Sequence, residues 1–167
     1  MNRRPVSRPV TPGRLLTAVV MGALAACQPR PAAVDPEDPT IVAAIDSIMR
    51  EVMEGAAAAD ADRVLAAAEG EGEFTFVSGD VALTGLPAIR ERFRRTYAMI
   101  ERQSNVVDER RIRVLSPDVA VLYAVGEGTY TDKAGWSSEP VGLGYTIVFV
   151  REQGQWRMRH AHQSVAP

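Results

Sequence analysis

This sequence of 167 residues has only one cysteine and two histidines, and their scarcity argues against several kinds of covalent and metal site. A single cysteine cannot form a disulfide within the chain. Two histidines, His160 and His162, fall short of the three or four nitrogen and sulfur ligands that hold a typical zinc ion. A site completed by carboxylates stays open as an alternative, but no pattern predicts a metal or an organic cofactor. The sequence also lacks a Ser-His-Asp order, a phosphate loop and a dinucleotide-binding glycine pattern.

The chain has no excess of positive charge. Its net charge is −2, but four of its arginines precede Cys27 and no acidic residue does. After Cys27, 15 basic side chains against 21 acidic ones leave a net charge of about −6. Because binding to nucleic-acid phosphates needs a basic face, we expect no nucleic-acid partner.

The N-terminus has the pattern of an export signal. Residues 1–14 are polar and positively charged, and residues 15–26 form an apolar run of 12, too short to span a bilayer but suited to a secretory signal. The run ends in Leu24-Ala25-Ala26-Cys27, which resembles the lipobox of bacterial lipoproteins, where the cysteine is acylated and becomes the new N-terminus. We therefore expect a signal peptide over residues 1–26 and lipidation at Cys27. The alternative is an ordinary signal peptide with an incidental cysteine.

A linker is expected between this anchor and the folded domain. Residues 28–38 are rich in proline and poor in large apolar side chains, which is typical of an extended tether. The predicted division is a tether over residues 27–37 and a single domain over residues 38–167. Gln28 stands where an Asp would indicate inner-membrane retention in some bacteria, so it favours an outer membrane, facing the periplasm.

Three helices are predicted in the first half of the domain. Asp38 can cap a helix that begins at Pro39, and one apolar stripe follows at helical spacing: Ile41, Ile45, Ile48 and Val52. Asp60 can cap a second, short helix that ends at Gly70. Pro87 begins a third helix, which also has one apolar face: Ile89, Phe93, Tyr97 and Ile100.

Strands are predicted for most of the remaining chain. Residues 73–77 and 81–83 form a short hairpin, and four longer candidates come later: 103–115, 119–130, 139–151 and 155–164. The long strands must pair antiparallel, because short turns join them. Glycines within them, such as Gly126 and Gly128, permit a bend. The expected fold is α+β: a cone-shaped, curved antiparallel sheet wrapped over three helices.

The end of the chain carries the clearest family pattern, Gly154-x-Trp156-(x)3-His160-x-His162-x-Ser164. Three further segments match in order: Gly85-Leu86-Pro87-Ala88-Ile89-Arg90, Ser116-Pro117-Asp118-Val119-Ala120 and Tyr145-Thr146-Ile147-Val148. With these, the chain over roughly residues 38–165 resembles the nuclear transport factor 2-like superfamily. It looks most like the SnoaL-like domains related to the association domain of calcium/calmodulin-dependent kinase II. The resemblance implies a pocket under the curved sheet and, usually, a homodimer through the outer sheet face.

The resemblance also suggests where a ligand would bind. In the kinase association domain, pocket arginines bind small carboxylates, and the corresponding positions here look like Ile147 and Gln163, so two cations are missing. An apolar pocket with few polar groups suits a small molecule. The residues that we expect to line such a pocket are Phe76, Phe93, Tyr97, Tyr123, Ile147 and Gln163.

Four residues are candidates for catalysis. His160 or His162 could act as a general base, because neutral imidazole accepts a proton near neutral pH. Tyr97 or Tyr123 could donate a hydrogen bond to a developing oxyanion. At strict period two, both histidines share a side with Met158, but a bulge would change the parity, so the face that lines the pocket stays open. The alternative is that these histidines are structural, on the outer face or at a dimer seam, and that the tyrosines simply pack in the core.

Together these patterns predict a lipid-anchored protein of the cell envelope whose single cone domain binds a small, mostly apolar molecule and forms a homodimer. Two other functions stay open. One is an enzyme of the isomerase, dehydratase or cyclase type that uses a pocket His or Tyr, and the other is a non-catalytic assembly module. A fold alone cannot choose among them.

Overall fold

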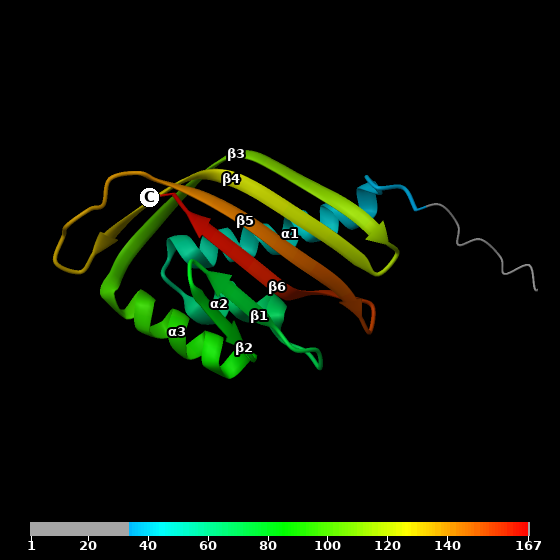
Figure 1. The fold of residues 1–167 in the computed structure, drawn as a ribbon, viewed down its shortest axis with the longest axis horizontal. Coiled ribbons are helices and arrows are strands. Elements are labelled where there is room, and N and C mark those ends of the chain that lie inside the picture. The colour runs from blue at the N-terminus through cyan, green and yellow to red at the C-terminus, as the bar shows by residue number, and fades with distance from the viewer. Residues whose placement is uncertain (1–33, 167) are drawn as a thin grey trace, which may run out of the picture. The chain divides into compact units, whose positions relative to one another are not determined.

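The computed structural model describes residues 34–166, in which six strands form one mixed sheet (Figure 1). The sheet order is β2-β1-β6-β5-β4-β3. The strands are β1 (Thr75–Ser78), β2 (Val81–Thr84), β3 (Ile100–Ser116), β4 (Val119–Asp132), β5 (Val141–Glu152) and β6 (Gln155–Val165). Strands β1 and β2 pair antiparallel, and so do β3 to β6 in succession, as predicted, but β1 and β6 pair in parallel. The predicted fold class is confirmed, with this one parallel pair as a difference.

Capping residues mark the starts of the first two helices. The helices are α1 (Pro39–Ala57), α2 (Ala61–Leu65), the short 3-10 helix η1 (Ala66–Ala68) and α3 (Leu86–Met99). The Asp38 carboxylate accepts hydrogen bonds from the backbone N–H groups of Thr40 and Ile41, and Asp60 caps α2 in the same way. Gly85 precedes α3 with a positive φ of 88°, a conformation that favours glycine.

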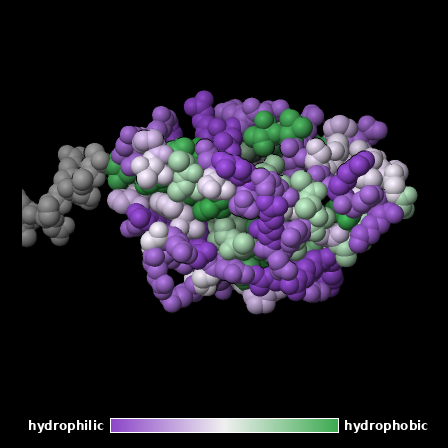
Figure 2. Space-filling model, turned by 180° about the vertical axis from the view of Figure 1, so that it is seen from behind, coloured by the Kyte–Doolittle hydropathy of each residue, from purple (hydrophilic) through white to green (hydrophobic). Residues whose placement is uncertain are grey.

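One face of the sheet, which we call the inner face, packs against the helices and forms the core. Leu122 of β4 and Phe149 of β5 are fully buried against side chains such as Ile45 of α1 and Ile89 of α3. The opposite face, which we call the outer face, carries the alternate residues of the same strands, such as Tyr123. Seen from the side opposite to that of Figure 1, the surface is mostly hydrophilic, with hydrophobic residues in separate patches (Figure 2).

A β-bulge in β3 changes which residues of this long strand face the helices, from odd-numbered before it to even-numbered after it. Val107 pairs with Gly126 and Glu109 pairs with Val125, so Asp108 is an extra residue. Before the bulge, odd-numbered residues such as Asn105 face inward, whereas after it the inward residues are even-numbered, such as Ile112. The partner strand has a glycine at this point because an added Cβ on Gly126 would lie 2.0 Å from the carbonyl oxygen of Val106.

A second bulge, in β6, decides which way the histidines point. His160 pairs with Val148 and Met158 pairs with Phe149, so Arg159 is the extra residue. Met158 therefore faces inward, and beyond the bulge Ala161 and Gln163 face inward in place of the histidines.

Contacts of the domain begin slightly before the expected boundary at residue 38. The backbone N–H of Val114 donates to the carbonyl oxygen of Pro36, and Arg113 forms an ion pair of 3.0 Å with Glu37. Cys27 and the predicted signal peptide lie outside the described residues. In the part of the chain that the structure describes, no helix is both long enough and apolar enough to cross a bilayer.

Candidate ligand-binding site

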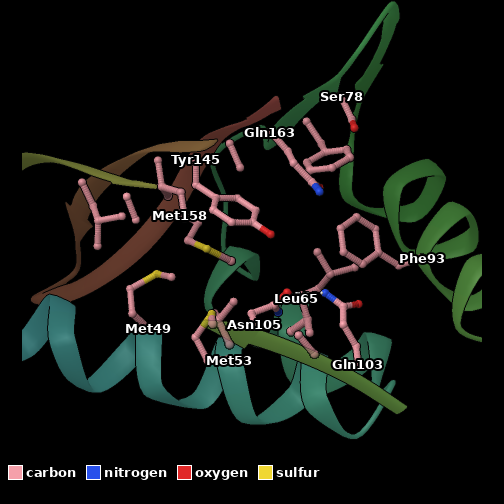
Figure 3. Close-up of a pocket in the computed structure, with 18 of the residues that line it drawn as sticks. Met49, Met53, Leu65, Ser78, Phe93, Gln103, Asn105, Tyr145, Met158 and Gln163 are labelled. Atoms are coloured by element: carbon pink, nitrogen blue, oxygen red, sulfur yellow. Dashed lines mark hydrogen bonds between the residues drawn. The ribbon is translucent and has the colours of Figure 1, made fainter. Parts of the chain in front are cut away.

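A cavity of about 350 Å³ lies between the inner face of the sheet and the helices. Its size is at the lower end of the range typical of small-molecule sites. Sulfur atoms line one part of it, from Met49 and Met53 of α1 and Met158 of β6 (Figure 3). Because methionine side chains are flexible and polarisable, this part can adapt to apolar groups of different shape.

Aromatic rings form one wall of the cavity. Phe76 of β1 meets Phe93 of α3 edge to face, with ring centroids 5.1 Å apart. Phe93 in turn meets Tyr97, one turn further along α3, at 5.8 Å. These edge-to-face contacts fix the three rings relative to one another, so the wall is more rigid than the methionines.

Two phenols are the most perturbed groups of the cavity. Burial raises the pKa of Tyr97 to about 12, with a smaller contribution from nearby Tyr145. Burial also raises the pKa of Tyr145, whose hydroxyl points into the cavity (Figure 3). Both phenols are therefore protonated near neutral pH and can donate a hydrogen bond. Within residues 34–166, neither hydroxyl has a hydrogen-bond partner.

The remaining polar side chains of the lining are three carboxamides, two arginines and the hydroxyl groups of Ser78 and Thr96. The Gln103 side-chain amide donates to Asn105 Oδ1 at 3.0 Å, and Gln163 reaches the cavity from β6. Arg110 lies 2.9 Å from Asp46 Oδ1, which balances its charge, whereas Arg92 is exposed. Among the described residues, no Asp, Glu or His lines the cavity.

The structure brings together five of the six pocket residues expected from the sequence: Phe76, Phe93, Tyr97, Ile147 and Gln163. Tyr123 lies elsewhere. It pairs with Thr146 of β5 and Arg111 of β3 on the outer face, where it is 38% exposed, because its neighbours Leu122 and Ala124 occupy the inward positions of β4. Tyr123 is therefore in no position to donate to a ligand in the cavity.

His160 and His162, the candidate bases, also lie outside the cavity. The ring of His160 is half-buried, with Nδ1 2.7 Å from the hydroxyl oxygen of Thr75 in the parallel strand β1, and His162 is exposed. The bulge at Arg159 is the physical reason, since it reverses the parity of β6 just before them. This position matches the alternative in which the two histidines are structural.

The sequence did not predict Tyr145, Gln103 and Asn105 as residues that line the pocket. A signal for Tyr145 was present, because it is two residues from Ile147 and a strand places such residues on one face. Gln103 and Asn105 share the same spacing, but polar residues in a strand are usually assigned to the solvent side. Within residues 34–166, no group of three or more His, Cys, Asp or Glu side chains is arranged to hold a metal ion.

Solved structures of other proteins share this fold at low sequence identity. A nuclear transport factor 2-like superfamily protein from Salmonella enterica has a TM-score of 0.69 at 17% identity, covering 77% of this chain and 93% of that one. A ketosteroid isomerase-like protein from Erwinia carotovora atroseptica has a TM-score of 0.62 at 21% identity, with coverages of 75% and 96%. A Xanthomonas campestris protein resembling the calcium/calmodulin-dependent protein kinase II association domain has a TM-score of 0.60 at 24% identity, with coverages of 82% and 94%.

These likenesses extend over nearly the whole of the other chains, and they concern the fold alone. A comparison of this sequence with curated proteins found no match. A family model for the SnoaL-like domain matches residues 45–167, which include all the strands and the cavity between them and the helices. The chain therefore belongs to the SnoaL-like domain family.

Proposed function

We propose that this protein binds a small, mostly apolar molecule in the cavity under its curved sheet. The observation that supports this most is the cavity itself, about 350 Å³ within a single domain and lined mainly by Met, Phe, Val, Leu and Ala side chains. Burial of apolar surface in such a cavity contributes roughly 25 cal/mol per Å², so a ligand of modest size gains enough to bind.

The experiment that tests the proposal blocks the cavity. Ala161 of β6 lines it and is half-buried, so Ala161→Phe places a ring in the space. We expect the full-length wild-type protein to bind the neutral fluorescent probe N-phenyl-1-naphthylamine, and the variant to bind it at least about tenfold more weakly, equivalent to 1.4 kcal/mol. The measurement is a fluorescence titration at constant protein concentration.

The matched control is Ala82→Phe. Ala82 is exposed on β2, between the cavity-lining residues Val81 and Leu83. The substitution therefore adds the same ring outside the cavity. It should leave the affinity for the probe unchanged. Equal binding by both variants and the wild type, or no binding by the wild type, would contradict the proposal.

An acid–base enzyme is less well supported. General base catalysis needs a group that accepts a proton near the working pH. The histidines lie on the outer face, and Tyr97, with a pKa of about 12, stays protonated at neutral pH. The phenols could polarise a carbonyl group, but among residues 34–166 the lining offers no carboxylate or imidazole to take a proton from it.

We also propose that the domain is held at a membrane of the cell envelope by a lipid on Cys27, because a basic segment, a short apolar run and Leu24-Ala25-Ala26-Cys27 occur in that order. In a bacterial host, the wild-type chain should fractionate with membranes and carry acyl mass on an N-terminal Cys27. Cys27→Ala should remove that mass and the membrane association, whereas the control Gln28→Ala should keep both. Mass spectrometry of the mature N-terminus measures the outcome, and an unmodified cysteine would refute the anchor.

The expected homodimer stays a prediction. The outer face has exposed apolar side chains on β4, such as Tyr123 and Val125, which a second copy could cover. Sedimentation equilibrium of the protein distinguishes a dimer from a monomer.

A further inference from the structure

The two phenols of the cavity are polar groups that the described part of the protein leaves without a partner. Tyr97 belongs to α3 and Tyr145 to β5, so two separate elements bring them to one space. Tyr97 and Tyr145 are half-buried, and a ligand that covers their hydroxyls without offering an acceptor would remove hydrogen bonds to water without replacing them, which is costly. A ligand group can supply what residues 34–166 do not.

The chemistry of two protonated phenols favours an acceptor oxygen. Each O–H group donates one hydrogen bond, and a carbonyl oxygen has two lone pairs that can accept both. An aliphatic or aromatic hydrocarbon would leave both hydroxyls unsatisfied. The paired carboxamides of Gln103 and Asn105 satisfy part of their own hydrogen bonding, so they compete less for the same group.

The charges around the cavity argue for an uncharged ligand. A cation would find no Asp or Glu among the described residues of the lining. An anion would have to be stripped of water, and Arg110 is already balanced by Asp46 at 2.9 Å, while Arg92 is exposed to solvent. Burying a charge without a dedicated partner is far more costly than burying a carbonyl group that accepts hydrogen bonds.

The rest of the cavity accommodates an apolar body. The aromatic wall of Phe76 and Phe93 suits a flat ring, and the methionines opposite can adapt to its outline (Figure 3). Resting on the proposed binding function, we propose that the cavity takes an uncharged, mostly apolar carbonyl compound whose oxygen accepts hydrogen bonds from Tyr97 and Tyr145. This assigns the two tyrosines as the residues that determine which ligands are preferred.

Four naphthalene probes that differ in one substituent test the assignment on the full-length protein. They are 2-acetylnaphthalene, which has a carbonyl; 2-ethylnaphthalene, which has no acceptor; 2-naphthoate, which is an anion; and 2-(aminomethyl)naphthalene, which is a cation. A neutral hydrogen bond strengthens binding by roughly threefold, so two should make the ketone bind about tenfold more tightly than the hydrocarbon. Isothermal titration calorimetry measures the four dissociation constants, and both ions should bind more weakly than the ketone.

Tyr97→Phe and Tyr145→Phe keep the rings and remove the hydroxyls one at a time. Each should reduce the preference for the ketone over the hydrocarbon about threefold and leave the affinity for 2-ethylnaphthalene unchanged, which separates the lost hydrogen bond from any loss of packing. Tyr123→Phe, on the outer face, is the matched control and should retain the full preference.

The outcomes separate the two proposals. If none of the four probes binds, the proposed binding function itself fails. If 2-ethylnaphthalene binds as tightly as the ketone, the cavity binds ligands but the phenols do not select them. If 2-naphthoate or the amine binds most tightly, the ligand is charged and the inference is overturned. If both Tyr→Phe variants keep the preference for the ketone, the carbonyl contacts other residues.

Discussion

Replacing Gly126 with alanine will destabilise the domain by about 3 kcal/mol or more, because the new methyl group has nowhere to go. An added Cβ would lie 2.0 Å from the carbonyl oxygen of Val106 and 3.0 Å from the Cα of Val107. Both atoms belong to the backbone of β3 at its bulge, so no rotation of a flexible side chain can relieve the clash. Either the bulge shifts or the two strands separate.

The same strand pair places Asn105 and Val107 on one side of the bulge and Arg110 on the other, all facing the cavity. Urea unfolding followed by circular dichroism measures the loss of stability. Gly142→Ala, in the adjacent strand β5, is the matched control: its nearest obstacle is the Ala166 side chain at 3.2 Å, near the end of the described chain, so its effect should stay within about 0.5 kcal/mol. Equal effects of the two substitutions would show that the close contact at Gly126 is unimportant.

Glu152→Gln will lower stability at neutral pH, because Glu152 holds the bulge of β6 through Arg159. The Arg159 guanidinium donates to the Glu152 carboxylate and to the Ala68 carbonyl oxygen, which ties β6 to the end of η1. The hydrogen bonds from Arg159 are the largest cause that holds the pKa of Glu152 below its usual 4.5, and they outweigh burial, which raises it; the charge of Arg159 lowers it further. Glutamine keeps the size of the side chain and removes the charge.

The pH dependence distinguishes this ion pair from simple packing. A carboxylate whose folded pKa is depressed stabilises the fold above its unfolded pKa of 4.5, and this contribution is lost as the pH falls through the lower folded value. Wild type and Glu152→Gln should therefore differ in melting temperature near neutrality and converge well below 4.5. Glu139→Gln, at an exposed position, is the control and should match the wild type throughout. A difference that is constant with pH would rule out the charge of Glu152 as its cause.

The order of helices and strands was predictable from local signals. Asp38 before Pro39 marked the start of α1, and apolar residues at helical spacing marked its buried face. Each long strand after α3 was found at nearly its observed position, because period-two patterns and turn residues are properties of neighbouring amino acids. The parallel pairing of β1 with β6 was not predicted, because these strands are far apart in the chain and no local feature records their contact.

Part of the cavity could be predicted for the same reason. Phe93 and Tyr97 lie one helical turn apart, and Ile147 lies on the inward side of a regular strand, so periodicity alone placed them on the buried side. Tyr145 follows from the same rule as Ile147. The direction of the two histidines could not be predicted by this rule, because one extra residue, Arg159, moves every later side chain of β6 to the opposite face of the sheet.

By itself, the sequence determined the elements, the family and the apolar character of the pocket, since these depend on residue types and short-range spacing. The tertiary structure alone decided which side chains face one another. The two bulges, held by Gly126 and by the contacts of Glu152 with Arg159, set the direction of the residues beyond them. Tyr97 and Tyr145 line one cavity because α3 packs under the sheet, which brings together segments far apart in the chain. Such contacts depend on the packing of the whole domain, and no local pattern of residues encodes them.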